Sequence, residues 1–203
     1  MRGILRSAVA VGLLGFLGAV GVEAQVRVVL GVGGGTISPL SKSKWTVGSG
    51  TPVKSLGYGA QFMFGVQPAK GRVSVRLDGQ YASVNHELAG SGATTRAKDK
   101  LTGGNLDLVL HLGMARSAIR PYILAGPSFY HDSYRSVNTP AGDSTNSKVG
   151  FNGGAGLNLG RSERVWFFIE GRYVYTKIFD KTHSLVPVMA GVRISTHQVY
   201  AKK

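Results

Sequence analysis

Two histidine–serine pairs are the residues of this chain whose types and spacing suit nucleophilic chemistry. His131 and Ser133 are separated by one residue, so on a β-strand they share a face, and His183 directly precedes Ser184. A histidine base beside a serine hydroxyl can generate a nucleophile. Nothing in the sequence places an orienting carboxylate beside either pair, so we expect no catalytic site. The five histidines are scattered without a carboxylate cluster, and we expect neither a metal site nor a cofactor.

Charged residues of both signs recur at alternate positions of otherwise apolar segments. Arg76 and Asp78, for example, alternate with Val75 and Leu77. Because side chains point to opposite faces of a strand with a period of two, such charges gather on one face. We predict that they form ion pairs that plug a narrow barrel, since the interior of eight strands is just wide enough to be filled by side chains. The predicted network is Arg27, Arg76, Asp78, Asp107, Glu170, Arg172 and Arg193.

Eight segments with this alternation must position the charged residues. The clearest places large apolar residues at every second position from Leu56 to Val66, with glycine and polar residues between them. In a soluble barrel the apolar face would point inward. Here the other face carries charge and glycine, which favours a polar lumen and an apolar face turned to lipid. The predicted strands are 26–35, 56–66, 73–83, 101–112, 119–130, 148–159, 165–176 and 185–195.

The segment 119–130 is the least regular of the eight. Its alternation places Leu124 toward the interior among otherwise small or polar residues. Pro127 lies in the middle of the segment and cannot donate a ladder hydrogen bond. We therefore predict a bulge or bend at Pro127.

The connections between the segments alternate in length. The short ones are 67–72, 113–118 and 160–164. The long, polar ones are 36–54, 84–100 and 131–147, and 177–184 is intermediate. Short turns at one end and long loops at the other are typical of outer-membrane barrels, whereas a β-sandwich has no reason to segregate loop lengths. We predict an all-β fold, an eight-stranded antiparallel up-and-down transmembrane β-barrel.

The first residues have the pattern of a secretory leader. Arg2 and Arg6 precede an apolar core at 8–20, and Val22-Glu23-Ala24 provides small residues for a signal peptidase. The apolar run is shorter than the roughly 20 residues that a membrane helix needs. We predict cleavage after Ala24, which leaves a single barrel domain at 25–203. The chain has no cysteine, and export without disulfides is typical of a bacterial envelope protein stabilised by a closed barrel.

The chain is strongly basic, with a formal net charge of +14 at pH 7. It has no recognised nucleic-acid-binding motif, so we expect the phosphates of lipid headgroups or lipopolysaccharide as the anionic partner. Solvated loop charge is the alternative interpretation. The basic residues predicted in external loops are Lys42, Lys44, Lys54, Arg96, Lys98, Lys100, Arg135, Lys177 and Lys181.

Four motifs in the second half resemble the strand motifs of the small OmpA/OmpX-like outer-membrane β-barrel family. They are RPYILAG at 120–126, GFNGGAGLN at 150–158, WFFIEGRY at 166–173 and PVMAGVR at 187–193. The resemblance implies an eight-stranded up-and-down barrel with periplasmic termini. Chains of that family usually end on an aromatic residue, whereas this chain ends Tyr200-Ala201-Lys202-Lys203, so Tyr200 is the candidate for that role.

We expect a monomeric, non-catalytic protein of the bacterial outer membrane with a filled polar core. Its expected role is envelope integrity or surface interaction through the basic loops, with outer-membrane lipid and lipopolysaccharide as partners and no nucleic acid. A narrow porin-like channel for small solutes is the alternative. The spacing of His131 and Ser133 is also similar to that of PagL-like lipid A deacylases, although the flanking residues differ, so a surface lipid hydrolase is a third hypothesis.

Overall fold

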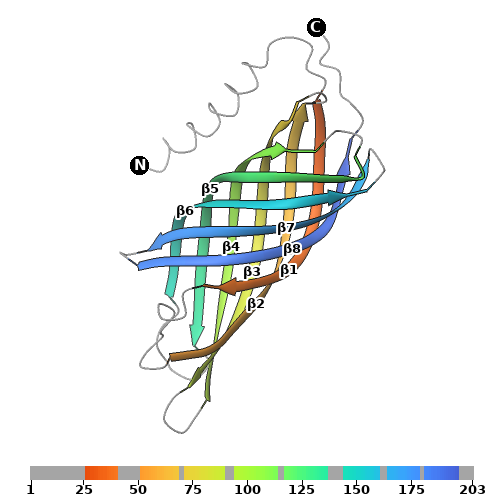
Figure 1. Cartoon of the computed structure of the whole chain (residues 1–203). Helices are drawn as coiled ribbons and strands as arrows, with labels where there is room; N and C mark the ends of the chain where they lie inside the picture. The colour runs from red at the N-terminus through yellow and green to blue at the C-terminus, as the bar shows by residue number, and fades with distance from the viewer. Residues whose placement is uncertain are drawn as a thin grey trace, which may run out of the picture.

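The chain forms a closed barrel of eight antiparallel strands (Figure 1). The structure is a computed structural model, which describes residues 26–40, 51–68, 71–89, 94–113, 117–136, 144–160, 164–178 and 181–196. Each strand pairs with its neighbours in sequence, and β8 pairs with β1 to close the sheet. The predicted fold is therefore confirmed. The predicted leader at 1–24 lies outside the described residues.

Each strand is longer than the roughly 9–11 residues that a β-strand needs to cross a membrane. They are β1 Val26–Pro39, β2 Thr51–Pro68, β3 Val73–Ala89, β4 Thr94–His111, β5 Ile119–Ser136, β6 Ser144–Leu159, β7 Val165–Ile178 and β8 Lys181–Ser195. We call the end where β1 begins and β8 ends the turn end, and the opposite end the loop end. No helix in the described residues is long and apolar enough to cross a membrane.

The strand bounds agree with the prediction at the turn end and differ at the loop end. Pairing of β3 with β4 continues to Ala89 and Thr94, and pairing of β7 with β8 continues to Ile178 and Lys181. The long loop predicted at 84–100 and the intermediate one predicted at 177–184 are therefore wrong. The ladder uses backbone groups, which polar side chains beyond the lipid do not interrupt. Apolar alternation marks only the part of each strand that faces lipid.

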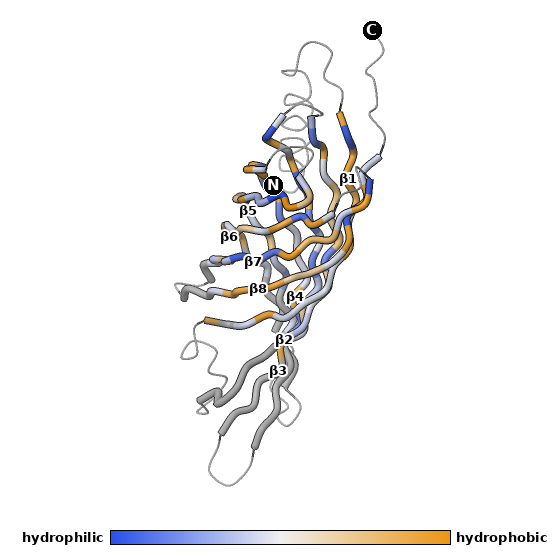
Figure 2. The backbone as a smooth tube through the Cα atoms, turned by 45° about the vertical axis from the view of Figure 1, so that its right-hand side comes forward, coloured by the Kyte–Doolittle hydropathy of each residue, from blue (hydrophilic) through white to orange (hydrophobic). Residues whose placement is uncertain are grey.

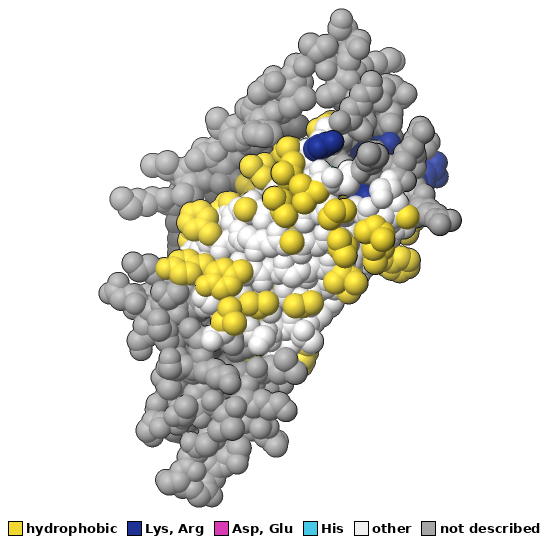
Figure 3. All heavy atoms as spheres, in the orientation of Figure 1, with side chains coloured by type: hydrophobic (Ala, Val, Ile, Leu, Met, Phe, Trp, Pro, Cys, Tyr) yellow, Lys and Arg dark blue, Asp and Glu magenta, His cyan; other side chains and the backbone are white. Residues whose placement is uncertain are grey.

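The outward face of the barrel carries a broad apolar belt. Phe62, Leu108 and Phe167 are 54%, 54% and 62% exposed, and similar residues on every strand surround the barrel. Figure 3 shows hydrophobic side chains across the middle of the visible face, and Figure 2 shows polar and apolar residues alternating along the strands. A soluble monomer rarely exposes so large an apolar surface. The belt is the surface that a barrel presents to lipid.

The irregularity predicted in β5 takes a different form from a bulge. Leu124 points inward and is buried, as predicted. The pairing of β4 with β5 skips Leu106 and Asp107, opposite Pro127 and Gly126, but the register is the same on both sides. No residue is inserted, so of the bulge or bend that the sequence predicted, the bulge is wrong. Proline lacks the N–H that a ladder bond needs, and the interruption stays local.

Glycines provide the room that large aromatic side chains occupy inside the barrel. Atoms of the Phe168 ring lie only 2.6 Å from the position that a Cβ on Gly33 would take and 2.7 Å from that of a Cβ on Gly191. The Tyr122 ring lies in the same way against Gly156. The interior of an eight-stranded barrel is narrow, so glycine opposite an aromatic ring lets the lumen fill without forcing the wall apart.

Candidate functional site

Four strands place six charged side chains in the lumen at the same level. Arg76 and Asp78 come from β3, Asp107 from β4, Glu170 and Arg172 from β7, and Arg193 from β8. All six are buried, each with 5% exposure or less. They lie on inward positions because they alternate with lipid-facing residues along their strands. We call these residues Arg76, Asp78, Asp107, Glu170, Arg172 and Arg193 the ion cluster.

Arg76 crosses the lumen to Glu170, 94 residues later in the chain. Its two terminal nitrogens donate to the two carboxylate oxygens at 2.8 and 3.0 Å, which is a bidentate pair. The Arg76 Nε donates to Asp78 at 3.1 Å on the same strand, and Asp107 lies 3.8 Å from the guanidinium group. One arginine thus links three carboxylates from three strands.

Arg172 contacts the same three carboxylates from the other side. Its Nε donates to Glu170 at 2.7 Å, and one terminal nitrogen donates to Asp107 at 3.0 Å. The other terminal nitrogen forms an ion pair with Asp78. Arg76 and Arg172 therefore share all of the carboxylates of the ion cluster, which makes these five residues one network rather than separate pairs.

Arg193 lies at the edge of the ion cluster and depends mainly on neutral partners. It donates to Glu170 at 3.3 Å, the longest of its contacts, and to the Tyr122 hydroxyl at 2.9 Å and Asn158 Oδ1 at 2.8 Å. Its guanidinium group also lies between two aromatic rings, 4.7 Å from the centre of Tyr122 and 4.8 Å from that of Phe168. Such cation–π contacts stabilise a desolvated arginine.

The ion cluster contains three arginines and three carboxylates, so its formal charge is zero. A buried ion pair adds little net stability when compared with well-packed apolar residues, because desolvation offsets the attraction. Removing one partner is costly, because an uncompensated charge is then left in the interior. The ion cluster therefore locks the relative positions of β3, β4, β7 and β8.

Uncharged side chains complete the polar part of the lumen. Asn152 donates to Asp107 at 2.8 Å and to Ser128 at 3.1 Å, and the Tyr122 hydroxyl donates to Glu170 at 2.7 Å. The predicted network included none of these residues. Their inward positions in the strand alternation, level with the charged residues, were the signal that could have identified them.

Among the described residues, the buried side chains in the loop-end half of the lumen are mainly apolar. This differs from the predicted polar core, which is confirmed only for the half toward the turn end. Tyr130 joins the two halves, with its hydroxyl 2.9 Å from Gln80 Oε1 and 3.2 Å from Asn105 Oδ1. We call the buried apolar side chains beyond it the apolar layer: Ile37, Ala82, Val84, Leu101, Val174, Leu185 and Met189.

Solved structures share this architecture. OprG, an outer membrane protein of Pseudomonas aeruginosa, matches with a TM-score of 0.59 at 14% identity, covering 86% of this chain and 98% of OprG. Neisserial surface protein A (NspA) matches with a TM-score of 0.53 at 16% identity, covering 85% of this chain and 98% of NspA. This chain has the fold of the small outer-membrane β-barrels. No protein-family model and no curated protein matches its sequence.

The apolar belt and the shared fold together support a location of this protein in the bacterial outer membrane. The lipid-facing segments account for the belt, and the ion cluster lies within their span. The likeness of fold agrees with the predicted resemblance to OmpA/OmpX-like proteins.

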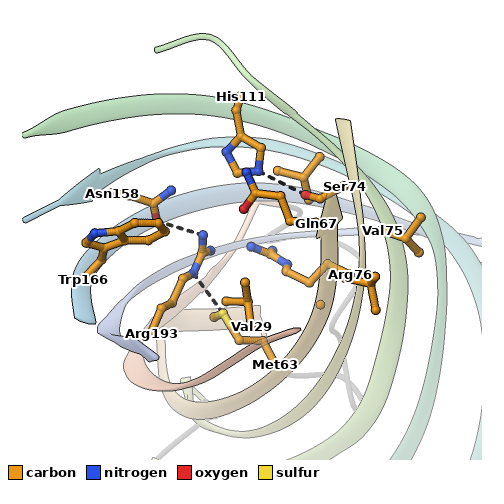
Figure 4. Close-up of a pocket in the computed structure, with 13 residues that line it drawn as sticks. Val29, Met63, Gln67, Ser74, Val75, Arg76, His111, Asn158, Trp166 and Arg193 are labelled. Carbon is orange, nitrogen blue, oxygen red and sulfur yellow. Dashed lines mark hydrogen bonds between the residues drawn. The ribbon is translucent and has the colours of Figure 1, made fainter. Parts of the chain in front are cut away.

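A small cavity opens into the barrel at the turn end (Figure 4). It has room for only a few water molecules. Arg76 and Arg193 extend toward each other across it, and His111 Nε2 lies 3.0 Å from Ser74 Oγ at its edge. The cavity thus reaches Arg76 and Arg193 of the ion cluster from the turn end, whereas the apolar layer covers the cluster on the other side.

The remaining predicted basic residues fall into three groups. Arg27 is half-buried on an inward position of β1 at the turn end. Lys42 and Lys44 lie outside the described residues. The other residues predicted in loops lie instead in the loop-end extensions of the strands, and of these the structure describes the side chain of Lys100, which is exposed. The loop-end positions are Lys54, Arg96, Lys98, Lys100, Arg135, Lys177 and Lys181.

In the structure, the histidine and serine residues of the two predicted pairs contact other side chains. His131 is exposed on β5, and its Nδ1 lies 3.2 Å from the Oγ of Ser147 on β6 rather than bonding Ser133. Ser184 is buried and its Oγ lies 2.8 Å from the hydroxyl of Tyr173. Within the described residues, no group of three or more His, Asp or Glu side chains is arranged to hold a metal ion.

Proposed function

We propose that the protein is a non-conducting, non-catalytic barrel of the bacterial outer membrane that acts at the cell surface through its loop end. The observation that carries the proposal is the filling of the lumen by two successive barriers. The ion cluster is neutral and joined across the barrel, and the apolar layer lies between it and the loop end.

Conduction through this lumen would need both barriers to open. Separating the ion cluster would leave buried charges without partners, which costs several kcal/mol for each broken pair. An ion would then have to pass the apolar layer without its hydration shell. The filled core therefore suits a barrel that stays closed, and interactions with other molecules are left to the surfaces at its ends.

The loop-end extensions of the strands carry the seven basic residues Lys54, Arg96, Lys98, Lys100, Arg135, Lys177 and Lys181. β2, β4 and β5 have 18 residues each and extend well beyond the apolar belt, compared with 14 in β1 and β7. Lys98 lies opposite Arg135 in the register and two positions from Lys100. A group of cations of this kind attracts phosphate, so we propose lipopolysaccharide phosphates as the ligand of the monomeric barrel.

The experiment combines conductance with binding. The purified protein in planar bilayers is expected to give no current steps. Immobilised lipopolysaccharide is expected to retain the wild type and to lose the triple variant Lys98→Gln, Lys100→Gln and Arg135→Gln at physiological salt. Equal retention of both proteins would contradict the proposed binding, whereas current steps from the wild type would contradict the closed lumen.

A narrow channel for small solutes is the second candidate, and the turn-end cavity is the observation that favours it. The cavity brings solvent to Arg76 and Arg193, so a rearrangement of these two side chains is the first step that a channel would need. This alternative predicts conductance that changes with Arg76→Gln or Glu170→Gln. A silent wild type and silent variants would remove it.

A further inference from the structure

The outward residues of β3, β4, β5 and β6 form rows across the barrel wall at the loop-end border of the apolar belt. These four strands lie side by side, and residues that pair in the register share a row (Figure 1). One such row crosses all four strands, because each of its members pairs with the next. We call this row, in which every side chain is exposed, the border row: Tyr81, Thr102, His131 and Ser147.

The row on the turn-end side of the border row still belongs to the apolar belt. It consists of Gly79, Gly104, Phe129 and Val149. A Cβ on Gly79 would meet nothing within 4 Å. Phe62 pairs with Gly79 and Phe129 pairs with Gly104, and these two aromatic side chains are 54% and 53% exposed. The two glycines therefore leave a low strip of wall between two exposed phenyl rings, and an acyl chain can lie against it.

The row on the loop-end side of the border row introduces positive charge on the outer wall. Lys100 lies two residues from Thr102, and it is exposed whereas the intervening Leu101 is buried, so Lys100 shares the outward face with Thr102. Its partner in the register is the half-buried Ser133 of β5. Two residues along a strand correspond to about 7 Å. The ammonium group of Lys100 therefore belongs to the level at which lipid headgroups meet water.

Acidic residues are absent from this part of the outer wall. In the described strands, the outward register positions from the border row to Lys98 and Arg135 contain hydroxyl, amide, imidazole and basic residues, and no Asp or Glu. The next outward position of β3 is Glu87, which lies opposite Arg96 in the register. Over successive rows the wall thus changes from apolar to hydroxyl-rich and then to cationic. A phosphorylated sugar attached to acyl chains presents the complementary groups in the same order.

We propose that the outer wall of β3 to β6 binds lipid A, the acylated and phosphorylated disaccharide by which lipopolysaccharide is anchored in the membrane. Lys100 contacts a phosphate of lipid A, since an ammonium group offers three donors and a positive charge. Thr102 and His131 donate hydrogen bonds to that phosphate or to the sugar, and an acyl chain lies along Gly79 and Gly104. This inference rests on the proposed function and deepens it, because it assigns the lipid part of lipopolysaccharide as the ligand and adds residues of the border row to the cations.

The test measures binding of lipid A that carries no core sugars. The protein is reconstituted in phosphatidylcholine nanodiscs with increasing fractions of diphosphoryl lipid A, and native mass spectrometry counts the lipid A retained by each barrel. The double variant Thr102→Val and His131→Leu is expected to bind about tenfold more weakly than the wild type, because it removes two hydrogen-bonding side chains of the border row. The double variant keeps Lys98, Lys100 and Arg135, so its net charge at neutral pH is nearly unchanged.

Two further variants make the result specific. Thr36 is exposed on the outward face of β1, between Tyr58 and Val188 in the register, so Thr36→Val is the matched control and is expected to leave the affinity unchanged. Monophosphoryl lipid A is expected to bind the wild type about fivefold more weakly than the diphosphoryl form, the usual effect of one cation at an anionic surface. Lys100→Gln is expected to lose most of that difference. The mobility of each unboiled variant on SDS gels shows whether its barrel is closed.

Three outcomes would overturn the inference. The double variant could bind lipid A as tightly as the wild type, or Thr36→Val could weaken binding as much as the double variant does. The third is a wild type that binds complete lipopolysaccharide but not lipid A, which would assign the site to the core sugars and leave the proposed function intact. A wild type that binds neither would contradict the proposed function itself, so the two failures are distinguishable.

Discussion

Glu170 accepts more hydrogen bonds than any other carboxylate of the ion cluster. It accepts from Arg76 at 2.8 and 3.0 Å, from Arg172 at 2.7 Å, from Arg193 at 3.3 Å and from the Tyr122 hydroxyl at 2.7 Å. The substitution Glu170→Gln keeps the shape of the side chain but leaves three buried guanidinium groups with two carboxylates. Breaking a buried ion pair costs about 3–5 kcal/mol, and we expect the free energy of unfolding to fall by about that amount.

A second substitution separates charge balance from lost contacts. Arg193 has the weakest link to the carboxylates, so the double variant Glu170→Gln and Arg193→Met leaves Arg76 and Arg172 balanced by the two aspartates. We expect the double variant to be more stable than the sum of the two single changes predicts, by about 0.5–3 kcal/mol, which is the usual range for groups in one network. The methionine fills most of the space between the neighbouring aromatic rings.

Urea unfolding in phospholipid vesicles measures these differences, with the unboiled fraction on SDS gels as an independent count of folded protein. Lys100→Gln is the control, because this exposed cation at the loop end should change the free energy of unfolding by less than about 0.5 kcal/mol. The reasoning is refuted if Glu170→Gln costs no more than the control. It is equally refuted if the two single changes add without coupling, because the cluster would then not be one network.

The other predictions compare residues inside the barrel with matched residues outside it. Gly156→Ala, whose Cβ would meet the Tyr122 ring, should destabilise the barrel by about 1–3 kcal/mol. Gly171→Ala, whose Cβ would meet nothing within 4 Å, should be nearly neutral in the same urea unfolding experiment. Tyr122→Phe removes a hydroxyl from the ion cluster and should cost about 1–3 kcal/mol, more than Tyr173→Phe at the surface. Expression of the wild type should leave the mass of lipid A unchanged, as should Ser133→Ala; a mass shift that disappears with Ser133→Ala would reveal a hydrolase.

The lipid-facing part of the fold could be predicted because lipid imposes a simple rule on it. Leu106, Leu108 and Leu110 alternate with inward residues. A strand in lipid must pair its backbone groups with neighbouring strands and turn apolar side chains outward, and this alternation meets both needs. The same rule located the six charged residues of the ion cluster on inward positions. The prediction also included Arg27 as a seventh member, which lies on an inward position of β1 at the turn end.

The loop-end half of the barrel escaped prediction because the rule does not apply there. Val84 and Leu101 point inward to the apolar layer, so an apolar residue at these positions no longer indicates a lipid-facing surface. Beyond Leu101 the side chain of Lys100 is exposed, and the sequence toward Thr94 is mostly polar. The alternation of apolar and polar residues is therefore lost at the loop end. The segments of β3 and β4 that continue to Ala89 and Thr94 then have the sequence pattern of a loop.

The partners within the ion cluster also lay beyond sequence reasoning. Arg76 and Glu170 are 94 residues apart and meet only because the closed barrel brings β3 and β7 to opposite sides of one lumen. Which inward residues share a level depends on the stagger of all eight strands, a property of the closed barrel and not of any single segment. The sequence could therefore indicate a plug but not its pairing.

The neutrality of the ion cluster indicates where the function of this barrel is concentrated. Three arginines and three carboxylates cancel in the lumen, so none of the net charge of +14 arises from these six residues. The cations that give the chain its charge lie in the loop-end extensions, at the turn end and in the remainder of the sequence. A selective channel needs uncompensated charge along its path, whereas this chain balances the charges at its centre. The lumen therefore sets the geometry of the barrel, and the proposed binding takes place at its loop end.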